Sequence, residues 1–130
     1  MNILIQGGRI IDPATETDSV GDLYIQDGKI AAINSAPADF SADQTIDAHG
    51  QIVCPGLVDM SAHAREPGPS QKGSIKTESS AAVAGGVTTF VTPPTSSPVV
   101  DTPAVAELIK DRCQEAGKMR ILPMGALTKG

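Results

Sequence analysis

The fold is decided at residues 55–68, which read Pro-Gly-Leu-Val-Asp-Met-Ser-Ala-His-Ala-Arg-Glu-Pro-Gly. The apolar start of this stretch, Gly56 to Met60, predicts a buried strand, and its Gly- and Pro-rich end predicts a loop. Because alternate side chains of an extended segment share a face, its polar side chains are expected to point the same way. These are Asp59, Ser61, His63 and Arg65.

The segments that follow this stretch alternate between helix and strand. A helix is predicted from about Ile75 to Ala84, and Gly85-Gly86 suits its end, where a left-handed residue is favoured. The β-branched run from Val87 to Thr92 predicts the next strand.

A second helix and a closing strand complete the pattern. Thr102 is expected to cap a helix that begins at Pro103 and stops at Gly117. Its apolar stripe predicts packing against the sheet, and Met119 to Met124 predicts the last strand. The stripe consists of Val105, Leu108, Ile109, Cys113 and Ala116.

The residues before Pro55 predict a small antiparallel β unit. Gly7-Gly8 is expected to form a turn, and Asp27-Gly28 predicts a type I′ hairpin, which needs positive φ. The last two strands are expected to join at His49-Gly50. The strands are predicted over 2–6, 9–11, 23–25, 30–33, 44–47 and 51–53.

Two domains of an α/β protein are therefore expected, residues 1–54 and 55–130. Strands alternating with helices indicate a parallel sheet, either the opening of a barrel or a small open sheet. A complete (β/α)8 barrel needs roughly 250 residues, and this chain has 130. The chain is thus expected to be part of a longer polypeptide or to fold as something smaller.

Composition excludes several classes of partner. The net charge of −5, without a basic run, argues against nucleic acid and anionic membranes. Residues 1–8 lack the basic start and long apolar stretch of a signal peptide, so none is expected, and no apolar run approaches roughly 20 residues. Cys54 and Cys113 are expected to be free thiols. A cytoplasmic protein is expected.

The order of motifs resembles the dihydroorotase family of cyclic amidohydrolases. Residues 59–68 resemble the family's Asp-x-His-x-His-x-Arg-Glu-Pro-Gly motif, and further matches run along the chain in the family's order. They lie at residues 8–13, 27–30, 46–48, 84–89 and 123–130. The resemblance implies a β-sandwich built from both chain ends and a zinc-dependent (β/α)8 barrel. It also implies interconversion of carbamoyl aspartate and dihydroorotate in pyrimidine biosynthesis.

Two positions depart from the family pattern. Ser61 stands where the family has its first metal-binding histidine, and a neutral hydroxyl is a poor zinc ligand. Thr95 stands where the family has a substrate-binding asparagine. His63 and Arg65 match the motif, so His63 is expected to be a vestigial ligand, and Arg65 and Thr95 a vestigial substrate site.

The resemblance to a subfamily without metal ligands predicts a non-catalytic subunit of an aspartate transcarbamoylase assembly. That protein is expected to lack a cofactor, to bind the catalytic chain of the transcarbamoylase and to form an oligomer. The alternative is an active zinc-dependent dihydroorotase or a related cyclic amidohydrolase. A third possibility is a partial chain without an independent role.

Structural roles compete with functional ones at single residues. For His63, a hydrogen-bonded histidine in a barrel mouth is favoured over a remnant ligand. Arg65 is expected either to hold a carboxylate or to form an ion pair, with Glu66 or Asp59 as partner. His49, in a turn, is expected at the surface.

Overall fold

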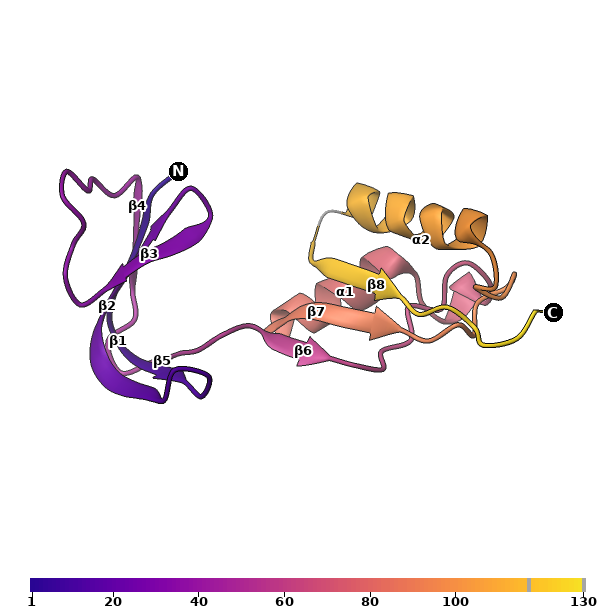
Figure 1. Ribbon diagram of the computed structural model, residues 1–130, viewed down its shortest axis with the longest axis horizontal. Helices are drawn as coiled ribbons and strands as arrows, with labels where there is room; N and C mark the ends of the chain where they lie inside the picture. Colours follow the sequence, from indigo (N-terminus) through magenta and orange to yellow (C-terminus); the bar gives the residue numbers. More distant parts are fainter. Residues whose placement is uncertain (117, 130) are drawn as a thin grey trace. The chain divides into compact units, whose positions relative to one another are not determined.

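The computed structural model describes residues 1–116 and 118–129. The chain divides into two compact units, residues 1–55 and 56–130, which are described separately (Figure 1). The predicted end of the second helix at Gly117 lies outside the described residues. No helix of the described residues is long and apolar enough to cross a membrane.

The first unit is a sheet of five strands, and it is mixed rather than antiparallel. β1 pairs antiparallel with β2, and β2 antiparallel with β3, as expected for successive hairpins. β4 and β5 both run parallel to β1, so the prediction that they form an antiparallel pair with each other was wrong. The strands are β1 (Ile3–Asp12), β2 (Thr17–Gln26), β3 (Lys29–Ile33), β4 (Gln44–Asp47) and β5 (Ile52–Val53).

The two glycine turns of this unit had different outcomes. Asp27 and Gly28 both have positive φ between β2 and β3, which confirms the type I′ hairpin. Gly7 has a φ of 70° but lies inside β1, where the pairing with β2 shifts register between Ile5 and Gly8. The predicted turn at Gly7-Gly8 is therefore a β-bulge in one continuous strand.

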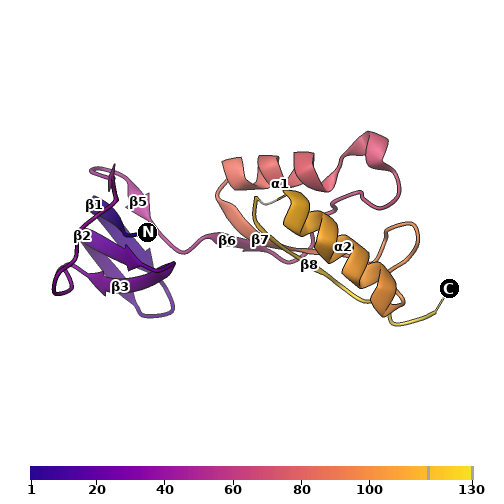
Figure 2. The same cartoon turned by 90° about the horizontal axis from the view of Figure 1, so that it is seen from above.

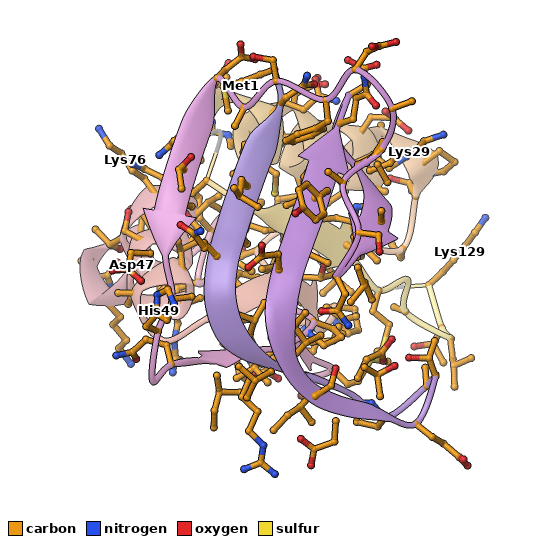
Figure 3. All side chains as sticks on the ribbon, turned by 90° about the vertical axis from the view of Figure 1, so that its left-hand side faces the viewer. Met1, Lys29, Asp47, His49, Lys76 and Lys129 are labelled. Carbon is orange, nitrogen blue, oxygen red and sulfur yellow. The ribbon has the colours of Figure 1, made fainter. Side chains whose placement is uncertain are left out.

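His49 lies at the surface, as predicted, just beyond the end of β4. Figure 3 shows its ring beside Asp47, and His49 Nδ1 lies 2.5 Å from Asp47 Oδ1. The backbone amide of His49 donates to the same carboxylate, and these bonds hold the pKa of Asp47 below its usual range. The Gln51 amide donates to the Ala48 carbonyl and closes the turn that leads to β5.

The second unit has three parallel strands in the order β6–β7–β8, with a helix in each crossover. Figure 2 shows α1 and α2 beside these strands. The parallel order and the α/β class predicted from the sequence are confirmed. The elements are β6 (Leu57–Asp59), the 3-10 helix η1 (Ser70–Lys72), α1 (Ile75–Ala84), β7 (Val87–Thr92), α2 (Pro103–Ala116) and β8 (Arg120–Pro123).

The bounds of α1 follow from its capping residues. Ser74 and Thr77 form a capping box, in which the Ser74 side chain accepts from the Thr77 amide. Gly86, with a φ of 84°, follows the last turn and supplies the left-handed residue that the Gly85-Gly86 pair predicted.

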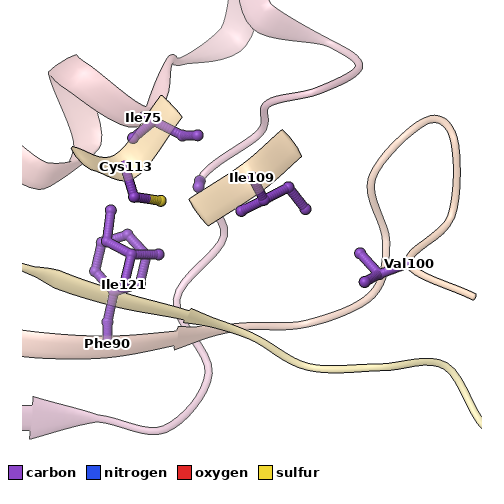
Figure 4. Close-up of a cluster of buried hydrophobic side chains, with 7 residues drawn as sticks. Ile75, Phe90, Val100, Ile109, Cys113 and Ile121 are labelled. Atoms are coloured by element: carbon purple, nitrogen blue, oxygen red, sulfur yellow. The ribbon is translucent and has the colours of Figure 1, made fainter. Parts of the chain in front are cut away.

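One apolar cluster joins both helices to the same face of the sheet. Phe90 of β7 and Ile121 of β8 are paired in register and point into it (Figure 4). α1 contributes Ile75, and α2 contributes Ile109 and Cys113. The buried residues of the predicted α2 stripe, Ile109 and Cys113, therefore pack against the sheet as expected.

Some positions predicted to be buried are exposed. Leu57 and Val58 of β6 are 55% and 59% exposed, because β6 is an edge strand with only β7 beside it among the described residues. Leu108 is also exposed, since it lies at the margin of the α2 stripe. Leu122 of β8, for which no burial was predicted, points to the sheet face opposite Ile121 and is exposed there.

Candidate functional site

A pocket of about 190 Å³ lies where the segment after β6 meets the segment after β7. Both strands are parallel, so their carboxyl ends and the loops that follow them meet at one edge of the sheet. The lining residues are His63, Arg65, Glu66, Pro69, Thr92, Pro93, Thr95, Ser96 and Ile109. Three of the four candidate site residues, His63, Arg65 and Thr95, are therefore brought together.

His63 and Thr95 are in direct contact across this pocket. Thr95 Oγ1 lies 3.2 Å from His63 Nδ1, and the tautomer of the ring decides which atom donates. One ring nitrogen of His63 therefore has a protein partner.

Ser61 is not among the residues that line the pocket. Its backbone amide donates to Asp59 Oδ1 at 2.9 Å, and its side chain is exposed. Asp59 and His63 line a second hollow of about 230 Å³ next to α1. The position expected to hold the lost metal ligand lies outside the pocket that holds the other three.

The expected alternation of side chains continues past the end of β6 at Asp59, because Ala62 and Ala64 pack into the apolar cluster while Ser61, His63 and Arg65 are exposed. Arg65 has a φ of 63°, in the left-handed region that costs an L-residue about 1–2 kcal/mol. His63 and Arg65 lie on the side of the loop opposite the buried Ala64, and both line the pocket with Thr95.

Glu66 pairs with Arg112, so the predicted ion pair of Arg65 with Glu66 is wrong. Arg112 Nη1 of α2 donates to Glu66 Oε1 at 2.5 Å, and the Ile75 amide donates to Glu66 Oε2 at 3.0 Å. Both carboxylate oxygens are thus engaged. Among the described residues Arg65 has no ion pair, with Asp59 or any other acid.

Sequence reasoning missed Arg112 as the partner of Glu66. The only available signal was its place on α2, three residues after Ile109 and one before Cys113. A side chain that borders a buried stripe in this way lies close to the neighbouring elements.

Backbone hydrogen bonds hold the two pocket loops together. The Ala62 amide donates to the Val91 carbonyl at 3.0 Å, and the Ser97 amide donates to the Pro67 carbonyl at 2.8 Å. The second bond joins the loop that carries Arg65 to the loop that carries Thr95.

The described residues do not form a metal site by themselves. Residues 1–116 and 118–129 contain no group of three or more His, Cys, Asp or Glu side chains placed to hold an ion. Catalytic zinc typically has three protein ligands, and the pocket contributes His63 and Glu66, whose carboxylate is engaged by Arg112. Burial, with a smaller effect of Glu66, raises the pKa of the Cys113 thiol to about 11, so this thiol stays protonated.

Residues 50–130 match the model of a family described as dihydro-orotase-like. The chain belongs to this dihydroorotase-like family. Over all 130 residues it is 55% identical to a dihydroorotase-like protein of Pseudomonas aeruginosa and 40% identical to a dihydroorotase of Geobacter metallireducens. It spans 31% of the length of each of these relatives.

Solved structures confirm the expected amidohydrolase fold. An L-hydantoinase (dihydropyrimidinase) from Arthrobacter aurescens superposes with a TM-score of 0.83 at 27% identity. The match covers 95% of this chain and 27% of the hydantoinase. A triazine hydrolase superposes with a TM-score of 0.67 at 22% identity, over 99% of this chain and 36% of the hydrolase, which supports the fold alone.

Proposed function

We propose that this chain belongs to a non-catalytic dihydroorotase-like protein of pyrimidine biosynthesis, which acts as a structural partner of aspartate transcarbamoylase. The observation that carries the proposal is the state of the motif at residues 59–68. Ser61 replaces a metal-binding histidine and is not part of the pocket, while His63 is bonded to Thr95. Catalytic zinc typically has three protein ligands, and this motif offers a single histidine, so this part of the chain is poorly suited to hold one.

The pattern of relatives supports the same proposal. Identity is 55% and 56% to two Pseudomonas proteins named dihydroorotase-like, and 40% and 41% to two proteins named dihydroorotase. The framework that shapes the loops, such as Pro67 and Gly68, matches the family motif, whereas Ser61 and Thr95 do not. A chain that keeps its fold but changes at chemical positions suits a scaffolding role.

The alternative is an active zinc-dependent dihydroorotase or related cyclic amidohydrolase. The observation that favours it is that His63 and Arg65 line one pocket, with Arg65 unpaired among the described residues. A guanidinium in such a place could hold a substrate carboxylate. Under this alternative, His63 would bind zinc together with ligands from elsewhere in the full protein.

A gene deletion with complementation tests the proposal. On deletion, we expect the transcarbamoylase to lose its assembly or activity, and we expect both wild type and the variant His63→Ala with Arg65→Ala to restore them. Normal assembly and activity of the transcarbamoylase without this protein would refute the partnership. If the double variant restored assembly but abolished dihydroorotate turnover, the enzymatic alternative would hold.

The oligomeric state and the cytoplasmic location are part of the same proposal. Co-purification of the full protein with the catalytic chain of the transcarbamoylase from the soluble cell fraction is the expected result. Recovery of the full protein as a monomer, or in another fraction, would contradict these two points.

A further inference from the structure

We propose that Glu66 is a positioning residue, which fixes the backbone of Arg65 and thereby the shape of the pocket. The inference concerns the geometry of the pocket and does not depend on whether the pocket turns over a substrate. It rests on the contacts of Glu66 and of the residues on either side of it.

Glu66 is held between the two helices of the second unit. One oxygen accepts from Arg112 of α2 and the other from the amide of Ile75, the first residue of α1. A negative charge at this end of α1 is favoured by the helix dipole. The Glu66 side chain is 16% exposed and that of Arg112 is 46% exposed, so the carboxylate is the more buried partner of the pair.

Glu66 also lines two hollows of the surface. It lines the pocket that holds His63, Arg65 and Thr95, and it lines a crevice of about 180 Å³ with residues of α1 and α2. A change in the packing of the two helices would therefore move Glu66 and alter the shape of the pocket.

Arg65 lies between two anchored neighbours. Ala64 is 0% exposed in the apolar cluster, and Glu66 is tied to both helices. Left-handed backbone in a residue other than glycine persists only where the surroundings over-determine it. The two anchors provide that constraint, and they leave the Arg65 side chain at the pocket.

The effect of Glu66 extends to the second loop. Pro67, the next residue, accepts from the amide of Ser97, and the loop of Ser97 carries Thr95. Thr95 in turn contacts His63. Release of Glu66 should therefore disturb the His63–Thr95 contact as well as Arg65.

Nuclear magnetic resonance of the full protein tests this inference with two local probes. The first is the ring resonances of His63, assigned through His63→Gln, with His49 of the other unit as internal reference. The second is hydrogen exchange at the Ser97 amide, which reports the bond to Pro67. If Glu66 and Arg112 only add to global stability, the His63 resonances of the folded state should not shift, and exchange at Ser97 should speed up no more than exchange at the amides of β7 and β8.

Four variants separate positioning from general destabilisation. Arg112→Met and Glu66→Ala should shift the His63 resonances and speed exchange at Ser97, with His49 unchanged. Arg112→Lys keeps a positive charge and should restore values near wild type. Lys110→Met is the matched control, because Lys110 is on α2 and pairs with Glu107 at the surface, and it should change neither probe.

Unchanged His63 and Ser97 signals in folded Arg112→Met would overturn the proposal, as would equal shifts in Lys110→Met. If Glu66→Ala does not fold, Arg112→Met still decides, because it leaves the Glu66 bond to the Ile75 amide in place.

Discussion

The side chains of His63 and Thr95 come from different loops, 32 residues apart, and meet at 3.2 Å. By resemblance to the dihydroorotase motif, these positions are a metal ligand and a substrate contact. In this chain one ring nitrogen of His63 contacts a threonine hydroxyl, at the position where the motif has an asparagine. This contact underlies the first two predictions.

We expect the purified full protein to carry no zinc that depends on His63. Catalytic zinc needs about three protein ligands, and the residue two before His63 is a serine outside the pocket. Elemental analysis of wild type and His63→Ala should give equal metal contents. About one zinc per chain in wild type, lost in the variant, would contradict the prediction.

Restoring one histidine should not restore turnover of dihydroorotate. Ser61→His supplies an imidazole at a position outside the pocket, and Thr95 still lacks an amide. A missing buried hydrogen bond to a substrate costs about 1–3 kcal/mol. Steady-state assays of Ser61→His, and of Ser61→His with Thr95→Asn, measure this. Turnover by Ser61→His alone would show that the pseudoenzyme proposal is wrong.

At position 65, glycine should be more stable than alanine. Both Arg65→Gly and Arg65→Ala remove the guanidinium, but only alanine keeps a Cβ in the left-handed region at a φ of 63°. The expected difference in unfolding free energy is about 1 kcal/mol in favour of glycine. Urea denaturation of the two variants tests it, and an alanine variant of equal or greater stability would argue against this backbone conformation.

The substitution Gly7→Ala should lower the free energy of unfolding, mainly because alanine would have to adopt a positive φ. Gly7 has a φ of 70°, and an added Cβ would come within 2.3 Å of the His49 ring. The ring is exposed and can rotate away, so the expected cost is about 1–2 kcal/mol from φ alone. Thermal or urea unfolding of Gly7→Ala with and without His49→Ala measures it. Full recovery of stability by His49→Ala would show that the ring contact dominates.

A polypeptide of residues 1–130 alone should self-associate or be poorly stable. Leu57 and Val58 are exposed on an edge strand, and Leu122 is exposed on the sheet face away from the helices. Unpaired strand edges and exposed apolar side chains favour association. Light scattering after size exclusion should show oligomers, fewer in Val58→Lys. A monodisperse monomer that unfolds cooperatively would contradict this expectation.

The family and most elements of secondary structure could be predicted from the sequence, because they depend on residues a few positions apart. The Asp27-Gly28 turn, the helix from Ile75 to Ala84 and the strand from Val87 to Thr92 were all predicted correctly. The sequence also identified His63, Arg65 and Thr95 as residues of one site, and the structure places them around one pocket.

Only the tertiary structure decided how distant segments meet. It made Gly7 a bulge, because β1 pairs with β2 on both sides of that residue. It left Ser61 outside the pocket that His63, Arg65 and Thr95 line, and it gave Arg65 a left-handed backbone. It also paired Glu66 with Arg112, 46 residues away. Such pairings depend on which surfaces are brought together by packing of the core, and local sequence patterns carry little information about that.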